Sequence, residues 1–505
     1  MAVAERDLPP PASHEPVPEA DPRRWRALTV LALVQFMIII DITVVNVALP
    51  TIQRALNFSA GGLAWIVDGY ALTAGGLLLL GGRMGDLLGR RRLFLIGTTL
   101  FAVASLTSGL AQNPTMLILS RFGQGAGEAL ASPAALALVV LLFRDAKERT
   151  KALGIWSGLA GLGGTVGVLL SGIIVNFVSW RWIFLINVPV ALVAIALVPR
   201  LVGESKAETT SRRVDIPGAV LVSGGVLALV DGLLAASRHP WGSAQVVWPL
   251  AGGILALLAL IVVERRARDP LIPVTFFSNR TRVSANIATA VMASGMFGMF
   301  FLLTLYLQQV LRYSPLETGL AYVPFGIGII TGITVSTKIL ERVGARTIIA
   351  TAYTIAGAGL LLLGGVTVNG SYVSDLLPTI LMLSFGMGAA FPAIQIAALH
   401  QVSAEDAGLG SGVQNTVLQV GGALGLAVLV TLAVRRTASS VAAGSAAAVA
   451  ATNGYALAFR VAALALFAAA LVALALVPGR QREAVAESNE LEHGFLLSEP
   501  VEEVS

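Results

Sequence analysis

The sequence predicts an all-α membrane protein whose helices cross the bilayer many times. Two observations support this fold class. Residues with apolar side chains make up 56% of the 505-residue chain and charged residues only 12%, which is too little charge to cover several soluble cores. The apolar residues also gather in runs as long as membrane-spanning helices, the form in which a chain satisfies its own backbone hydrogen bonds within lipid.

Other features of the composition exclude several classes of function. The Lys and Arg residues behind the net charge of +5 are scattered between apolar runs, whereas nucleic-acid binding needs a basic stripe. The chain has no Cys, and its four His residues lie outside the apolar runs. The phosphate-binding pattern GxxxxGK[ST] is absent as well. We therefore expect no enzyme activity, no bound metal or cofactor, no nucleic-acid partner and no use of ATP.

Apolar runs near the 20 residues needed to cross about 30 Å of hydrocarbon predict fourteen spans. Residues 1–26 lack the apolar segment of a signal peptide, so we expect a disordered cytoplasmic tail there, and an acidic disordered tail at 479–505. The expected spans are residues 27–49, 62–82, 93–111, 116–142, 152–175, 182–201, 217–237, 244–263, 284–307, 317–338, 347–367, 376–399, 409–433 and 455–477.

The basic residues orient these spans. Most of the 34 Lys and Arg residues fall in segments that are cytoplasmic if the N-terminus is inside, such as 83–92, 144–151 and 265–282. Because cytoplasmic loops retain Lys and Arg, we expect both termini to be cytoplasmic and the protein to lie in the cytoplasmic membrane. All seven Trp residues lie near span ends, where the amphipathic ring prefers the headgroup layer.

A short repeat divides the chain further. The loop after the second span contains Asp86-Leu87-Leu88-Gly89, and the loop after the tenth contains Glu341-Arg342-Val343-Gly344. This placement suggests an N-terminal six-helix half at 27–201 and a C-terminal six-helix half at 264–478. Residues 202–263 then form a cytoplasmic linker and two inserted helices. Duplicated halves are typical of transporters.

Ionisable residues within the spans are the first candidates for function, because a charge in hydrocarbon is costly. Arg121, Gln124, Glu128 and Ser132 fall on one stripe of the fourth span, with Glu128 near the midplane, and Asp41 lies in the first span. We expect Asp41, Arg121 and Glu128 to couple transport to protons. The alternative is that Asp41 and Arg121 form a structural ion pair.

Other polar residues differ in their expected depth in the membrane and in the helix face on which they lie. Asp68 and Asp231 are expected close to the outer interface, where solvation costs little and a structural role is favoured. In the first span, Asn46 shares a face with Gln35, but Asp41 points about 140° away from Gln35. Asp41 is therefore expected behind the surface that meets substrate.

Aromatic and amide side chains in the spans suit a roomy apolar pocket with a few polar anchors. Hydrogen bonding between helices is the alternative explanation for each of them. The candidate substrate-binding residues are Asn46, Gln124, Tyr306, Gln309, Phe391, Gln395, Gln414 and Asn415.

Four segments carry a family resemblance: Asp41 to Pro50, Gly82 to Arg91, Arg121 to Gly125 and Trp180 to Pro189. From about residue 27 to 478 the chain resembles the major facilitator superfamily, specifically its fourteen-helix drug:proton antiporter branch. The resemblance implies two major-facilitator halves with two helices inserted between them. It also implies a gating role for the loop residues Gly82, Asp86, Gly89, Arg90 and Arg91, with Asp86 meeting the positive end of a helix in the opposite half.

The fifth span resembles the antiporter motif of this branch in its glycines Gly154, Gly163, Gly167 and Gly172, which are likewise implied to serve gating. It departs from the motif in two places. The Gly-Pro pair reads Gly167-Val168, and a further glycine is Ser171. The small-residue face that permits close helix packing is kept, and the kink that a proline would cause is missing.

Together these features predict a proton-driven exporter of lipophilic drugs, antibiotics or related natural products that works by alternating access. Its partners are then a small lipophilic substrate, protons and the bilayer, and we expect a monomer. In the expected cycle, Asp41 or Glu128 is protonated from outside, and substrate arriving from inside displaces the proton. The alternatives are a proton-coupled importer of a small nutrient, and a membrane scaffold or sensor that transports nothing.

Overall fold

The computed structural model describes residues 23–143, 145–206, 215–267, 274–402 and 407–479, and it is helical throughout these ranges, with no strand. Thirteen helices or helix pairs are long and apolar enough to cross a membrane. A further helix, α6 (Ala146–Phe177), has an apolar stretch at Gly163–Phe177 and occupies the fifth predicted span. The prediction of fourteen spans agrees with this count. The tails predicted at 1–26 and 479–505 lie outside the described residues, apart from 23–26 and 479.

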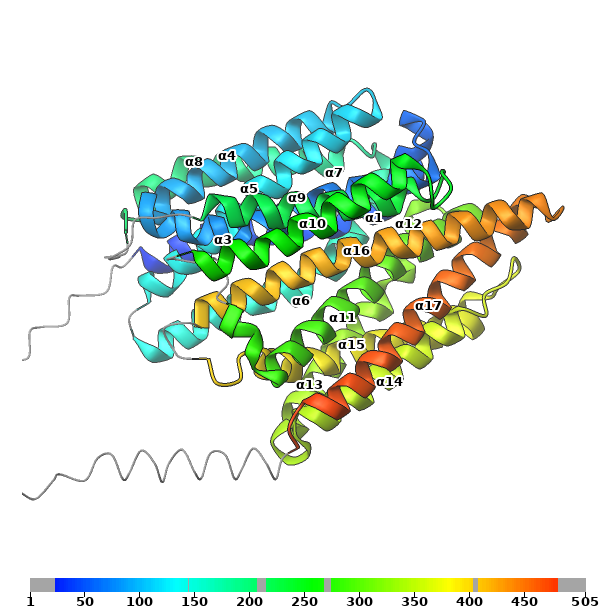
Figure 1. Ribbon diagram of the computed structural model, residues 1–505. Coiled ribbons are helices and arrows are strands. Elements are labelled where there is room, and N and C mark those ends of the chain that lie inside the picture. Colours follow the sequence, from blue (N-terminus) through cyan, green and yellow to red (C-terminus); the bar gives the residue numbers. More distant parts are fainter. Residues whose placement is uncertain (1–22, 144, 207–214, 268–273, 403–406, 480–505) are drawn as a thin grey trace, which may run out of the picture.

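The first eight helices form the first six spans, and two more follow (Figure 1). We call the first eight helices the first group. Their bounds are α1 Arg24–Leu56, α2 Ala60–Leu63, α3 Trp65–Leu88, α4 Arg90–Gly109, α5 Pro114–Leu142, α6 Ala146–Phe177, α7 Trp182–Leu185 and α8 Asn187–Leu201, and the two that follow are α9 Ile216–Ala235 and α10 Ala244–Arg266.

The remaining elements form the last six spans, and we call them the second group. Their bounds are η1 Val274–Ser278, α11 Arg280–Leu305, η2 Tyr306–Val310, α12 Pro315–Ala321, α13 Val323–Val343, α14 Ala345–Leu363, η3 Tyr372–Leu376, α15 Leu377–Ala398, α16 Ala407–Ala442 and α17 Ala447–Leu476. Because the number of spans is even, the start of α1 and the end of α17 lie on one face of the bundle. We call it the termini face and the opposite face the distal face.

Local signals in the sequence fix several helix starts. Asn113 caps α5 by accepting a hydrogen bond from the backbone N–H of Met116, and a proline takes the first helical position. At α12, Ser314 and Glu317 form a reciprocal capping box. The helices are nevertheless longer than the predicted spans, since α1 extends to Leu56 and α16 to Ala442. Apolar runs mark only the hydrocarbon layer, whereas helices continue into the polar interface.

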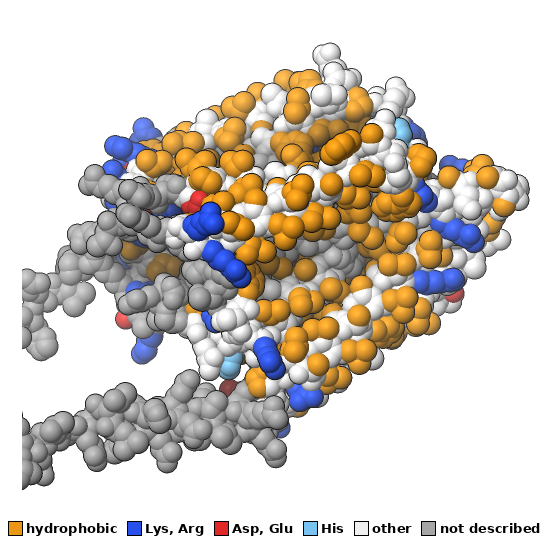
Figure 2. All heavy atoms as spheres, viewed as in Figure 1, with side chains coloured by type: hydrophobic (Ala, Val, Ile, Leu, Met, Phe, Trp, Pro, Cys, Tyr) orange, Lys and Arg blue, Asp and Glu red, His pale blue; other side chains and the backbone are white. Residues whose placement is uncertain are grey.

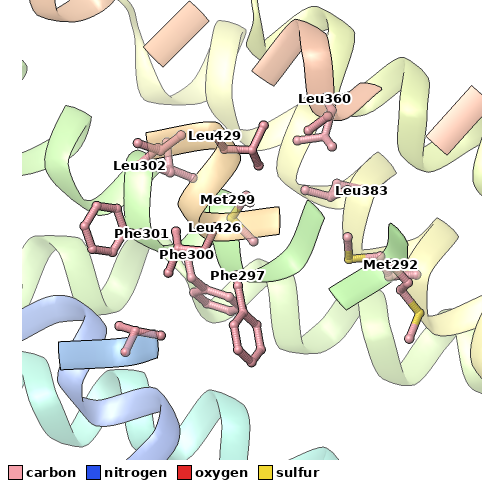
Figure 3. Close-up of a cluster of buried hydrophobic side chains, with 14 of the residues drawn as sticks. Met292, Phe297, Met299, Phe300, Phe301, Leu302, Leu360, Leu383, Leu426 and Leu429 are labelled. Carbon is pink, nitrogen blue, oxygen red and sulfur yellow. The ribbon is translucent and has the colours of Figure 1, made fainter. Parts of the chain in front are cut away.

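Packing within each group is close. In the first group α5 packs on α3 and α4, and α1 packs on α6 and α8. A Cβ atom at Gly127 of α5 would lie 2.6 Å from the backbone nitrogen of Phe101, so glycine is what permits this approach of α5 to α4. In the second group, large apolar side chains of α11, including Met292 and Met299, belong to one buried cluster with leucines of α14, α15 and α16 (Figure 3).

The surface agrees with immersion in a bilayer. Figure 2 shows apolar side chains over the middle of the molecule, with most Lys and Arg side chains toward its two ends. Only 11% of the most apolar 18-residue stretch of α10 is buried inside the protein, so this helix lies at the periphery of the bundle. It packs on α9, which in turn contacts α3 and α16. The protein is therefore a multi-pass membrane protein.

The predicted loop repeat has a matching backbone geometry in both groups. Gly89 separates α3 from α4 with a φ of 110°, and Gly344 separates α13 from α14 with a φ of 83°. Residues with a Cβ rarely adopt these angles, so glycine is needed at both turns.

The two groups touch along three seams. Side chains of η2 reach α1 near its distal end, where Gln308 Nε2 donates to the Val47 carbonyl oxygen at 2.8 Å. The hydroxyl of Thr416 on α16 donates to the Gly75 carbonyl oxygen of α3 at 3.0 Å. The third seam joins α6 to α12, where a Cβ atom at Gly172 would lie 2.8 Å from the Pro315 carbonyl oxygen.

Candidate functional site

A polar cluster lies buried inside the first group, centred on the carboxylate of Asp41. Oδ2 of Asp41 accepts a hydrogen bond from Arg121 Nη1 at 2.5 Å. Oδ1 accepts from Gln124 Nε2 at 2.9 Å and from Asn187 Nδ2 at 2.7 Å. Ser105 Oγ accepts from the same two amides, at 3.1 and 3.0 Å. The cluster thus joins α1, α4, α5 and α8.

The guanidinium of Arg121 is compensated on several sides. Its Nε donates to the Ile66 carbonyl oxygen at 2.9 Å, and its Nη1 also reaches Gln124 Oε1 at 3.0 Å. Its Cζ lies 4.2 Å from the centroid of the Tyr70 ring, a distance at which the aromatic face attracts a cation. Asp41 is 0% and Arg121 1% exposed, so the pair is closed to its surroundings.

The ion pair posed as an alternative is therefore present. The role of the two residues in coupling stays a prediction. Every oxygen of Asp41 already accepts an N–H group. A buried ion pair is costly to break from one side only, by about 3–5 kcal/mol.

Glu128 lies on the same stripe of α5 as Arg121, but its carboxylate has fewer hydrogen-bond partners than that of Asp41. It is 7% exposed, and its Oε2 has no hydrogen-bond partner among the described residues. It interacts electrostatically with Tyr70 and with the Asp41–Arg121 pair. One helical turn further along α5, Ser132 Oγ donates to Gln35 Oε1 of α1 at 3.0 Å, so the predicted stripe faces α1.

Asp68 overturns an expectation from the sequence. Its depth along the second span suggested a partly solvated position near the interface, but the side chain is 0% exposed, and in the part of the chain that the structure describes neither oxygen has a hydrogen-bond partner. The reason is tertiary, because α3 packs against α5, α9 and α16. An ionised carboxylate without a partner is very costly in such a place. Asp231, in contrast, is exposed.

Three of the candidate substrate residues are occupied by protein contacts. Gln124 is 0% exposed and belongs to the Asp41 cluster. Tyr306 is 0% exposed, and its hydroxyl donates to the Thr367 carbonyl oxygen at 2.6 Å. Asn46 is 7% exposed and bonds the backbone of its own helix at 3.4 Å. The polar groups of all three bond to other protein atoms, and their binding role stays a prediction.

The other five candidates are more varied. Phe391 is 40% exposed, and Asn415 is exposed as well. Gln395 is half-buried and Gln414 is 7% exposed. Gln309 donates to Gln53 Oε1 at 2.8 Å and lines a cavity. The structure does not gather all the candidates into one site, and their role in binding stays a prediction.

The loop between α3 and α4 is held within the first group. Asp86 Oδ1 accepts from Arg90 Nη2 at 2.7 Å, whereas the resemblance implied contact with a helix of the opposite half. Glu204, which the sequence did not single out, accepts from the backbone N–H groups of Arg91 and Arg92 at 3.1 and 3.2 Å. A carboxylate there complements the positive end of α4. Gly82, for which the resemblance implied a gating role, lies in the last turns of α3, and a Cβ there would approach Pro133 at 3.9 Å. Its role in gating stays a prediction.

Three glycines of α6 lie at its contacts. A Cβ at Gly163 or Gly167 would overlap side chains of α1, and Gly172 faces α12. Gly154 has no neighbour within 4 Å of its Cβ position. At the position where the motif has glycine, the hydroxyl of Ser171 donates to the Val44 carbonyl oxygen at 2.5 Å.

Sequence reasoning also missed Asn187 and Ser105 as members of the Asp41 cluster. Asn187 stood within a segment that carried the resemblance, and it is 2% exposed at the start of α8. A lone amide between apolar residues was the available signal. Ser105 gave no such signal, because serine is common at contacts between membrane helices.

The sequence matches known transporters over most of its length. The model of the Major Facilitator Superfamily matches residues 31–426. The puromycin resistance protein of Streptomyces alboniger is 40% identical over 422 residues, which is 83% of this chain and 84% of that protein. The lincomycin resistance protein of Streptomyces lincolnensis is 39% identical over 469 residues, or 92% and 94% of the two chains. The cephamycin export protein CmcT of Amycolatopsis lactamdurans is 38% identical over 417 residues, or 82% and 86%.

Solved structures share the fold at low sequence identity. A bacterial homolog of the human lysosomal transporter Spinster, in an inward-facing and unoccupied conformation, aligns with a TM-score of 0.60 at 17% identity, over 90% of this chain and 96% of that one. The xylose transporter XylE from E. coli, in an inward-open conformation, gives 0.60 at 14% identity, over 90% and 97%.

Proposed function

The chain belongs to the Major Facilitator Superfamily, and we propose that it exports lipophilic drugs, antibiotics or related natural products across the cytoplasmic membrane in exchange for protons. The relatives named for resistance or export support the direction and the substrate class. We place both termini in the cytoplasm, from the basic loops. The termini face is then the side on which substrate enters, and the distal face is the side on which it leaves.

Alternating access in this proposal is a movement of two six-helix halves, the first and second groups. The exchange needs no cofactor, because the proton gradient supplies the energy. It also needs a carboxylate that changes its protonation during the cycle, and a link from that carboxylate to the movement of the halves.

The observation that carries the coupling proposal is the contrast between three buried carboxylates. Asp41 is saturated by Arg121, Gln124 and Asn187. Glu128 has an unpartnered Oε2 only two turns from Arg121 on the same helix, and is the group best placed to carry the proton. Asp68 is a second group of this kind, on the helix that packs against α16 of the second group.

In the proposed cycle, Glu128 takes up a proton when its surroundings are open to the outside. Neutral Glu128 no longer competes with Asp41 for the charge of Arg121, so the Asp41–Arg121 pair tightens. When the site opens to the cytoplasm, arriving substrate and loss of the proton reverse this change. The steps change the balance of charge among Glu128, Asp41 and Arg121, and these charges act strongly on one another because all three side chains are buried.

The test is export of puromycin, the drug in the name of one relative, into inverted vesicles with an imposed pH gradient. We expect uphill export by the parent, loss of uphill export in Glu128→Gln with downhill exchange retained, and parental behaviour in the control Asp231→Asn. If Glu128→Gln exports as steeply as the parent, Glu128 does not carry the proton. Uptake in the opposite direction would favour the nutrient importer, and absence of movement for a panel of compounds would favour the scaffold or sensor.

A further inference from the structure

A cavity of about 300 Å³ lies toward the distal face, away from the Asp41 cluster. Its wall combines apolar side chains, among them Phe301, Leu305 and Val430, with the polar side chains of Gln53, Gln309 and Tyr455. Residues of both groups line it, since α1 and α2 contribute from the first group and α11, η2, α16 and α17 from the second.

The polar side chains form a chain of hydrogen bonds along the wall. Tyr455 Oη donates to Gln309 Oε1 at 3.3 Å, and Gln309 Nε2 donates to Gln53 Oε1 at 2.8 Å. Tyr455 is 7% exposed, so its hydroxyl is available only to this chain or to a molecule inside the cavity. The second of these bonds crosses from one group to the other.

The backbone of η2 explains how two neighbouring glutamines reach the same helix. Residues Tyr306–Val310 form a π-helical turn, a rare and wider geometry that is frequent at functional sites. In an α-helix adjacent residues diverge by about 100°. Here Gln308 reaches the Val47 carbonyl oxygen and Gln309 reaches Gln53, so both bridge to α1.

We propose that this cavity is an exit subsite, in which a lipophilic substrate is held on its way out and loosens the contact between the two groups. A substrate with a hydrogen-bonding group competes with Gln53 for Gln309, and the loss of that bridge favours opening of the distal face. The inference rests on the proposed export function and adds a second place at which substrate binds.

The size and chemistry of the cavity define its ligand. Ligand pockets usually measure about 300–1,000 Å³, so this one takes a single ring system of a drug rather than a whole large drug. Its donors and acceptors are the hydroxyls of Tyr455 and Thr437 and neutral amides, and no Lys, Arg, Asp or Glu is among its lining residues. We therefore expect a neutral aromatic or aliphatic moiety with one hydrogen-bonding group, such as the methoxyphenyl ring of puromycin.

The absence of Cys from the whole sequence makes a direct test simple. Ala438 lines the cavity and is exposed, whereas its exposed neighbour Ser439 is not part of the lining. Single variants Ala438→Cys and Ser439→Cys are labelled with a maleimide in vesicles, with and without puromycin. At about ten times the apparent Kd, puromycin should slow labelling of Ala438→Cys about tenfold by mass action and leave Ser439→Cys unchanged.

Second-site variants locate the effect. Gln309→Leu and Tyr455→Phe, each added to Ala438→Cys, should raise the puromycin concentration needed for protection. Equal protection of both cysteines, or none at concentrations that saturate export, overturns the exit subsite. Export by the same vesicles separates the two proposals. Export without protection rejects the subsite alone. Protection without export rejects the export function and the exit role, and leaves only a ligand site. If neither export nor protection is seen, both proposals are rejected for this drug.

Discussion

Replacement of Asp41 by Asn, alone and together with Arg121→Gln, separates the structural role of the buried ion pair from its role in coupling. The single variant leaves the guanidinium without its counter-charge where the two side chains are 0% and 2% exposed. The double variant removes both charges, and the amide side chains can still bond Gln124, Asn187 and the backbone. The two variants therefore differ in one quantity, the uncompensated buried charge.

The magnitudes follow from the contacts. Breaking a buried pair from one side costs about 3–5 kcal/mol, and the remaining contacts of Arg121 with Ile66 and Tyr70 place the expected loss at the lower end. The double variant exchanges charged for neutral hydrogen bonds and should cost about 1–2 kcal/mol. An unfolding entropy of about 2.1 cal/mol/K per residue converts 1 kcal/mol into about 1 °C for a chain of 505 residues. The melting temperature should therefore fall roughly 3 °C in the single variant and about 1–2 °C in the double one.

The assay is thermal unfolding of purified protein in detergent, with puromycin export from inverted vesicles measured on the same variants. We expect the double variant to regain most of the stability and none of the uphill export, because protonation of Glu128 then has no Asp41–Arg121 ion pair to act on. Two results contradict this reasoning. Either Asp41→Asn unfolds at the parental temperature, or the double variant exports against a gradient, in which case the pair serves folding only.

Three further predictions use other contacts. Gly167→Val should force α6 away from Thr43 of α1 and lower the free energy of thermal unfolding by about 1–3 kcal/mol. Gly154→Ala, whose Cβ meets open space, should leave the stability unchanged. Equal effects of the two variants would show that contact between the helices is not the cause. Asp86→Asn loses a partly exposed pair with Arg90 worth at most about 1 kcal/mol, yet should depress puromycin export, and unchanged export would end its proposed gating role. Reporter domains fused to either terminus should stay cytoplasmic, and translocation of one would reject the orientation.

Hydropathy and charge were sufficient to predict the fold, because the bilayer imposes a length and a composition on every span. The same physics indicated that Asp41 and Arg121 must be paired or functional. The partners of Asp41 could be predicted less well. Gln124 was assigned to substrate, and Asn187 to no role, because the sequence does not state which helices adjoin α1.

Asp68 shows the limit of reasoning about depth. Counting helical rise from the end of a span places it near the interface, and that estimate concerns only its own helix. Its helix α3 packs against α16, which lies more than 300 residues away in the chain and belongs to the second group. Gln309 shows the same limit, since its cavity is completed by α1 and α2 of the first group.

The missing proline of α6 bears on how the two groups move. The helix is unbroken over 32 residues, and Ser171 bonds α1 where the motif has glycine, so α1 and α6 are tied together along their length. The first group is then expected to move as one body, and the change of access falls on the contacts between groups. Among the described residues the bridges there, from Gln308 to Val47, from Gln309 to Gln53 and from Thr416 to Gly75, are single hydrogen bonds worth about 0.5–1.5 kcal/mol each. Two conformations that differ by only a few kcal/mol can be exchanged by a ligand that binds one of them better, so binding of one substrate or one proton is enough to change which face is open.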